Sequence, residues 1–154
     1  MHSAPIAAPS SPMFFHFLYQ WASLAALAIA VITALWRGGW PERAGAIAMV
    51  AAWVATALFQ SSLQRWGVKT GVMIIDTLLL VALLTIALKS SRWWPMWATG
   101  FQAMNVVLHL AVMADARIWG WAYFVAGSVF SYLTMIALFV GALSCPRPEK
   151  PAAD

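Results

Sequence analysis

Apolar residues form five long runs along this chain, separated by short segments that contain charges, glycine or proline. Each run of about 18–26 residues is long enough to cross the roughly 30 Å hydrocarbon core of a bilayer as an α-helix. The expected helices cover about residues 14–36, 42–63, 70–88, 95–115 and 118–143. The pattern predicts an all-α fold: a polytopic integral membrane protein whose single domain is a bundle of five transmembrane helices with short loops.

The segments outside these runs contain residues that start or end helices. The glycines and proline of Arg37-Gly-Gly-Trp-Pro41 end the first run, and Glu42 suits the first turn of the next helix. Residues 1–13 are small, proline-rich and without Lys, Arg, Asp or Glu, which predicts a disordered tail and not a signal peptide. Residues 144–154 are charged and proline-rich, which predicts a flexible C-terminal tail. Cys145 is the single cysteine, so no intrachain disulfide can form.

Three polar residues interrupt the run at 95–115. Gln102, Asn105 and His109 are spaced three and then four residues apart, which places them on one helical face. Such a face avoids lipid, so the other helices are expected to pack against it. Asp76 lies within the run at 70–88, where an ionised side chain costs at least about 2.5–3.5 kcal/mol. Asp76 is therefore expected to face the bundle interior with a partner.

Alternating helix directions place polar residues from several helices in the same half of the bilayer, and the opposite half is expected to be mainly apolar. A short connection makes the helices at 70–88 and 95–115 antiparallel neighbours. Equal depth then puts Asp76 and His109 within direct or water-bridged reach, with Asn105 one turn deeper. This predicts a polar pocket open towards the N-terminal side, with an ion pair or a neutral pair that titrates as one unit. The candidate ligand or proton site comprises Asp76, His109, Asn105, Gln102, His16, Gln20 and Gln60.

The residue types in this pocket allow several chemistries. His16 and His109 could be the axial ligands of one haem, and with a carboxylate they could bind a divalent metal. A carboxylate beside an imidazole can relay a proton, and the polar residues can also simply bond neighbouring helices together. No diagnostic spacing selects a haem, a pigment or a metal, and no catalytic motif is present. We therefore expect no enzyme, and the sequence leaves any cofactor undetermined.

Small residues recur at four-residue spacing on three of the predicted helices, and such rows let helices approach closely in lipid. The rows comprise Ala22, Ala26, Ala30 and Ala34, then Ala44, Ala48 and Ala52, and the pair Gly127 and Ser131. Together with the short loops, they favour helix-mediated association as the primary function, as an accessory subunit of a membrane complex or a small homo-oligomer. The alternative is a binder or carrier of a small ligand, ion, proton or haem through the pocket around Asp76 and His109.

Composition and charge agree with a lipid bilayer as the main partner. Hydrophobic residues make up 63% of the chain and charged residues 9%, against roughly 25% charged in soluble domains. Six basic residues fall on one predicted face of the membrane and three on the other. The first side carries Arg37, Arg43, Lys89, Arg92, Arg147 and Lys150, and the second carries Arg65, Lys69 and Arg117. This bias predicts that the N-terminus lies outside and the C-terminus in the cytoplasm, and the membrane is expected to be a bacterial inner membrane. No basic stripe with stacking aromatics is present, so nucleic acid is not expected as a partner.

The chain has ten tryptophans, and most lie at predicted span ends, where interfacial belts form. Five spans, this chain length and the many tryptophans resemble the tryptophan-rich sensory proteins of the translocator family. Trp40-Pro41 and Asn105 echo the Trp/Pro-rich first loop and the Asn-centred middle helix of that family. The resemblance is one of architecture and assigns no binding residues.

Overall fold

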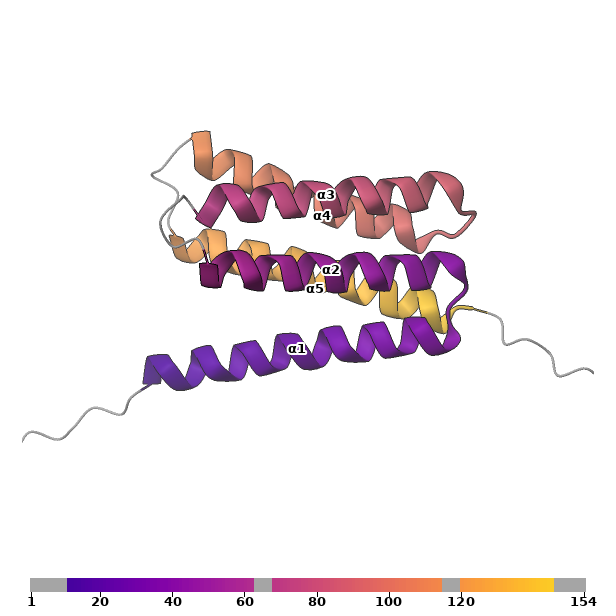
Figure 1. Ribbon diagram of the computed structural model, residues 1–154, viewed down its shortest axis with the longest axis horizontal. Coiled ribbons are helices and arrows are strands. Elements are labelled where there is room, and N and C mark those ends of the chain that lie inside the picture. Colours follow the sequence, from indigo (N-terminus) through magenta and orange to yellow (C-terminus); the bar gives the residue numbers. More distant parts are fainter. Residues whose placement is uncertain (1–10, 63–67, 115–119, 146–154) are drawn as a thin grey trace, which may run out of the picture.

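The computed structural model describes the backbone of residues 11–62, 68–114 and 120–145, and side chains within 21–59, 70–114 and 121–145. This part of the chain folds into five α-helices and contains no strand. The helices are α1 (Ser11–Arg37), α2 (Trp40–Ser62), α3 (Val68–Lys89), α4 (Trp94–Ala114) and α5 (Gly120–Leu143), as Figure 1 shows. The predicted all-α helical bundle is therefore confirmed.

The helices begin and end within three residues of the expected positions. The largest difference is at α1, which begins at Ser11, so the end of the expected tail at 1–13 is helical. After α5, Ser144 still donates its backbone N–H to the carbonyl of Val140 over 3.0 Å, so helical bonding runs into the expected C-terminal tail. The rest of the two expected tails lies outside the described residues.

The five helices form a ring in chain order. Each helix packs against the next, and α5 returns to pack against α1, with a smaller contact between α2 and α5. The α1–α2 and α3–α4 turns lie at one end of the bundle, while α3 begins and α4 ends at the other (Figure 1). Successive helices are therefore antiparallel, as their short connections require.

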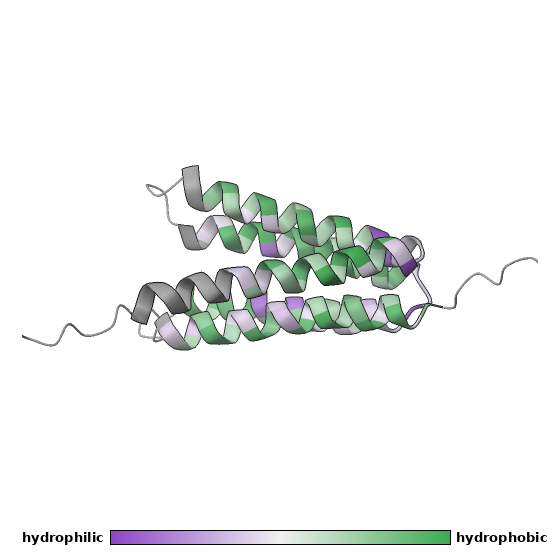
Figure 2. Cartoon of the chain, turned by 90° about the horizontal axis from the view of Figure 1, so that it is seen from below, coloured by the Kyte–Doolittle hydropathy of each residue, from purple (hydrophilic) through white to green (hydrophobic). Residues whose placement is uncertain are grey.

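The outer faces of the helices are apolar. Ile32, Ile47 and Leu78 are 61%, 64% and 65% exposed, and hydrophobic positions run along the length of the bundle (Figure 2). Water disfavours so much exposed apolar surface, whereas the bilayer core solvates it. Four described segments are long and apolar enough to cross a membrane, and the described side chains of α1 form a shorter apolar segment, Trp21–Arg37. The four are Trp40–Phe59, Thr70–Lys89, Trp94–Ala114 and Trp121–Leu143. The chain is therefore a membrane protein.

Hydroxyl groups on the outer faces bond to the backbone of their own helix. Thr33, Thr77 and Thr85 each donate to the carbonyl four residues earlier over 2.7 Å. A hydroxyl bonded in this way does not need water, so these threonines are compatible with a lipid environment.

The small residues of the predicted packing rows lie at different depths in the fold. In α1, Ala30 and Ala34 are 2% and 0% exposed and belong to the core, whereas Ala26 is half-buried and Ala22 is exposed. The half-buried members of the other rows are Ala44, Ala48, Ala52, Gly127 and Ser131. The row on α1 therefore contacts other helices of the same chain towards its C-terminal end.

Candidate functional site: a buried acidic network

Neighbouring helices α3 and α4 bring Asp76 and the polar row of α4 together. Asp76 lies eight residues into α3, about 12 Å along the axis at 1.5 Å per residue. Gln102, Asn105 and His109 are 2%, 6% and 6% exposed, and all three bond to Asp76. The prediction that this row faces the interior of the bundle is confirmed.

The Asp76 carboxylate is held by three side chains of α4. Its Oδ1 and its backbone carbonyl accept hydrogen bonds from Gln102 Nε2 over 3.1 and 3.2 Å, and its Oδ2 accepts one from Asn105 Nδ2 over 3.2 Å. His109 Nε2 lies 2.7 Å from Oδ2. Because the Asp76 side chain is only 16% exposed, these groups replace the water that an exposed carboxylate would bind. Asp76 and His109, predicted to lie within direct or water-bridged reach, are therefore in direct contact.

Tyr123 of α5 extends the network to a third helix. Its hydroxyl lies 2.7 Å from His109 Nδ1, and the two rings meet edge to face with centroids 5.6 Å apart. A neutral imidazole with its proton on Nε2 donates to Asp76 and accepts from Tyr123, whereas an imidazolium donates to both. We call Asp76, His109 and Tyr123 the polar triad. Its three residues can hold protons in more than one arrangement.

The structure does not describe the side chains of the other residues of the predicted pocket. His16 and Gln20 lie on α1 and Gln60 lies on α2, and their side chains are outside the described residues. Among the described side chains, no group of three or more His, Cys, Asp or Glu lies close enough to hold a metal ion. A haem with two histidine ligands, or a metal held by two histidines and Asp76, would need a second histidine besides His109, and the side chains of His2 and His16 lie outside the described residues.

A second polar cluster lies at the opposite end of the bundle, around Glu42. This residue is 0% exposed, and its Oε2 accepts the backbone N–H of Gly39 over 2.8 Å, which caps the first turn of α2. Its Oε1 accepts a hydrogen bond from Trp94 Nε1 over 2.9 Å, and Arg92 Nε lies 3.8 Å from the same oxygen. The expectation of mainly apolar packing in this half of the bilayer therefore missed a buried carboxylate.

Trp94 is a fully buried side chain that packs against the backbones of α2 and α5. A Cβ atom on Gly45 would lie 2.6 Å from Trp94 Cη2, and one on Gly141 would overlap the indole ring. Glycine at both positions therefore lets the indole approach the helix backbones. The neighbouring tryptophans Trp93 and Trp97 are 47% and 60% exposed, so the sequence cluster combines one core residue with two interfacial ones.

No protein-family model matches this chain, and no curated protein and no solved structure is significantly similar to it. The fold defines the class to which the chain belongs: a small α-helical membrane protein with short turns between its helices. Within that fold, the polar triad joins three helices through two hydrogen bonds of 2.7 Å between titratable side chains.

Proposed function

We propose that this membrane protein binds a proton and passes it on at the polar triad. The observation that carries the proposal is the continuous hydrogen bonding from Asp76 Oδ2 to His109 Nε2 and from His109 Nδ1 to the Tyr123 hydroxyl, with 2.7 Å at each step. Both distances suit proton transfer between adjacent heavy atoms. Ionisable residues inside membrane helices are commonly part of proton or ion pathways, because packing alone does not require them.

The triad passes a proton by two coupled transfers. A proton that reaches the Tyr123 oxygen from the N-terminal side of the bundle releases the proton of the hydroxyl to His109 Nδ1, while Nε2 gives its own proton to Asp76 Oδ2. Tyr123 stays neutral throughout. The triad resets when Asp76 releases its proton towards the other end of the bundle and the proton on His109 returns from Nδ1 to Nε2. Gln102 and Asn105 hold the carboxylate in place for this transfer, since Gln102 bonds to its Oδ1 and Asn105 to its Oδ2. The imidazole is suited to the middle position because its two nitrogens can each donate or accept.

Few other charged groups face the triad from the described helices. The charged residues in the described parts of α1 and α2 are Arg37, Glu42 and Arg43, which all lie at the opposite end of the bundle. On α5, Tyr132 is the other titratable residue, and its hydroxyl lies 2.7 Å from Ser23 Oγ of α1. A proton-linked signal from this half of the described bundle is therefore expected to come from the triad.

Proton transport through reconstituted protein tests the proposal. Vesicles of phosphatidylcholine containing the wild-type chain should dissipate an imposed pH difference faster than empty vesicles. Asp76→Asn and His109→Phe should abolish this flux, whereas Tyr132→Phe, a matched change on α5, should preserve it. Infrared difference spectra between acidic and basic buffer should also show a carboxyl signal that Asp76→Asn removes. A wild-type protein with neither proton flux nor this carboxyl signal would refute the proposal.

Helix-mediated association, as an accessory subunit or a small homo-oligomer, is the second candidate function. The observation that favours it is Gly100 on the outer face of α4, where an added Cβ would meet nothing within 4 Å. Small residues facing lipid allow another transmembrane helix to approach closely. If this face mediates association, Gly100→Leu should lower the oligomer mass seen by native mass spectrometry in nanodiscs, and a monomeric wild type would exclude the homo-oligomer.

We infer in addition that the end of the bundle with the α1–α2 and α3–α4 turns faces the cytoplasm of a bacterial inner membrane. The support is the excess of Lys and Arg in the segments that the sequence assigns to that side of the membrane, six residues against three. A Ser91→Cys substitution in a Cys145→Ser background places a single thiol on the exposed α3–α4 turn. An impermeant maleimide should label it only after the inner membrane is opened, and labelling of intact spheroplasts would mean the reverse orientation.

A further inference from the structure

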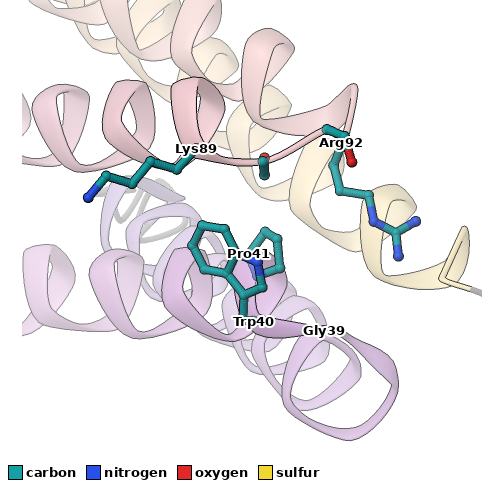
Figure 3. A pocket seen from close by; sticks show the side chains of 7 residues that line it. Gly39, Trp40, Pro41, Lys89 and Arg92 are labelled. Atoms are coloured by element: carbon teal, nitrogen blue, oxygen red, sulfur yellow. The ribbon is translucent and has the colours of Figure 1, made fainter.

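A pocket of about 290 Å³ lies at the end of the bundle opposite to the polar triad. It is a half-open depression between the turn from α1 to α2 and the turn from α3 to α4. Its lining residues are Gly39, Trp40, Pro41, Lys89, Ser90, Ser91 and Arg92. Figure 3 shows Trp40 and Pro41 on the α2 side of this pocket, with Lys89 and Arg92 extending to its two sides from the α3–α4 turn.

The charge around this pocket is positive. Lys89 and Arg92 line it, and Arg37 and Arg43 lie at the same end of the bundle. Glu42 is 0% exposed, and its Oε1 lies 3.8 Å from Arg92 Nε. Arg92 Nη2 also donates a hydrogen bond to Cys145 Sγ over 3.0 Å. Arg92 is therefore already held in part by groups of the protein, and Lys89 is the more exposed of the two lining cations.

The polar groups of the lining are mainly hydrogen-bond donors. The Lys89 ammonium and the Arg92 guanidinium can only donate, and the Arg92 side chain keeps 35% of its surface exposed. The hydroxyl of Ser90 is buried and has no hydrogen-bond partner in the described part of the chain. An oxyanion accepts hydrogen bonds from all of these groups and would supply the partner that this hydroxyl lacks.

The pocket lies at the level of the membrane surface. Two of the spanning segments begin at Trp40 and Trp94, and a third ends at Lys89. Trp40 and Trp93 are 55% and 47% exposed, as expected for tryptophans among lipid headgroups. Phosphate groups of lipids lie at the same level, and a volume of about 290 Å³ has room for one phosphate with several waters at about 30 Å³ each.

We propose that this pocket is a binding site for a phosphate group, carried by an anionic phospholipid or free in solution. Lys89 supplies the main positive charge for the phosphate, Arg92 adds a second cation on the other side, the serine hydroxyls bond the phosphate oxygens, and Trp40 covers the apolar part of the headgroup. The proposal is independent of proton transfer at the triad, because it uses different helix ends and different residues.

Native mass spectrometry and phosphate binding distinguish the two sources. Wild-type protein is incorporated into nanodiscs of mixed phosphatidylglycerol and phosphatidylcholine in phosphate-free buffer, and the lipids retained after release are counted. Phosphatidylglycerol should be retained in preference to phosphatidylcholine, and Lys89→Gln should reduce this preference about fivefold. In the second arm, inorganic phosphate is titrated into protein in pure phosphatidylcholine nanodiscs and followed by calorimetry. Heat that saturates and that Lys89→Gln removes would identify a soluble phosphate as the ligand.

Matched variants distinguish phosphate binding in this pocket from general attraction by positive charge on the surface. Arg43→Gln removes an exposed cation from the same end of the bundle without changing the pocket lining, and it should leave both signals nearly unchanged. Ser90→Ala keeps every charge and should still weaken binding, because it removes one donor. Equal losses for Lys89→Gln and Arg43→Gln, or no binding in either arm, would overturn the proposal. Thermal unfolding of each variant shows that the fold is retained.

Discussion

The indole nitrogen of Trp94 donates a hydrogen bond to Glu42 Oε1 over 2.9 Å, and both side chains are 0% exposed. This bond joins the first residue of α4 to the first turn of α2, which lie 52 residues apart in the sequence. The other carboxylate oxygen of Glu42 bonds to Gly39 N–H. One side chain therefore caps its own helix and fixes the position of another helix.

Removing this carboxylate should destabilise the protein. Glu42→Ala leaves Trp94 Nε1 and Gly39 N–H without an acceptor and should lower the free energy of unfolding by about 2–4 kcal/mol. Glu42→Gln has one carbonyl oxygen for two donors and should show a smaller loss. Denaturation by sodium dodecyl sulfate in mixed micelles measures both changes. Arg43→Ala is the control on the next residue, and a similar loss for this exposed position would contradict the explanation.

The glycines around Trp94 should not tolerate a side chain. Gly141→Ala places a methyl group that overlaps the indole ring of Trp94. It should lower the free energy of unfolding by about 1–3 kcal/mol, because the packed core can relax only in part. Gly45→Ala should act in the same direction. Gly100→Ala is the matched control on the outer face of α4, where helix propensity should raise the stability by up to about 1 kcal/mol. Thermal unfolding that ranks Gly141→Ala above or equal to Gly100→Ala would show that Trp94 does not need these glycines.

Burial along α1 predicts different effects for two alanines of the same row. Ala34→Leu adds volume at a position that is 0% exposed and should lower the stability by about 1–3 kcal/mol. Ala22→Leu adds the same volume at an exposed position, where lipid can accommodate it. Unfolding temperatures in detergent should therefore separate the two variants. Equal temperatures would mean that the α1 row does not pack inside the bundle.

Tyr123→Phe should change the state of His109 without unfolding the protein. The substitution keeps the aromatic contact with the imidazole but removes the hydroxyl that lies 2.7 Å from Nδ1. The ¹⁵N chemical shifts of the His109 ring, which report the tautomer, should therefore move, while the stability falls by roughly 1 kcal/mol. Tyr132→Phe makes the same chemical change on α5 at a hydroxyl bonded to Ser23. Ring shifts that respond equally to both variants would argue against the Tyr123 contact.

The contact between Asp76 and His109 could be predicted because spacing within one helix, one short turn and the cost of exposing polar groups to lipid determine it. The three-and-four spacing of Gln102, Asn105 and His109 fixes one helical face. A short turn fixes the antiparallel arrangement of α3 and α4, and the cost of exposing polar groups to lipid fixes which way both faces turn. Together these facts restrict the partners of Asp76 to polar residues at a similar depth on the inward face of α4.

The position of Glu42 could not be predicted in the same way. Its sequence neighbours explain the cap on Gly39, since the spacing from an N-cap to a glutamate at the third helical position is recognisable. The bond to Trp94 depends on how far α4 is rotated relative to α2, which no spacing within either helix determines. Nor does the sequence show which tryptophan of the cluster is buried, because that depends on the glycines at 45 and 141 on two other helices. Tyr123 is a similar case, since depth in the membrane does not say which way its side chain turns.

The closing contact between α1 and α5 has a consequence for biosynthesis. The ring cannot form until the last helix has left the ribosome and entered the membrane. That helix supplies Tyr123 to the polar triad and Gly141 to the packing site of Trp94. In a partly synthesised chain, both the triad and this packing site are therefore incomplete. Until α5 is in place, Asp76 and Trp94 lie in the translocon or in lipid without the neighbours that α5 supplies. A chain that ends before residue 120 would therefore lack the α5 side of both sites, and Asp76 on α3 would be incompletely packed.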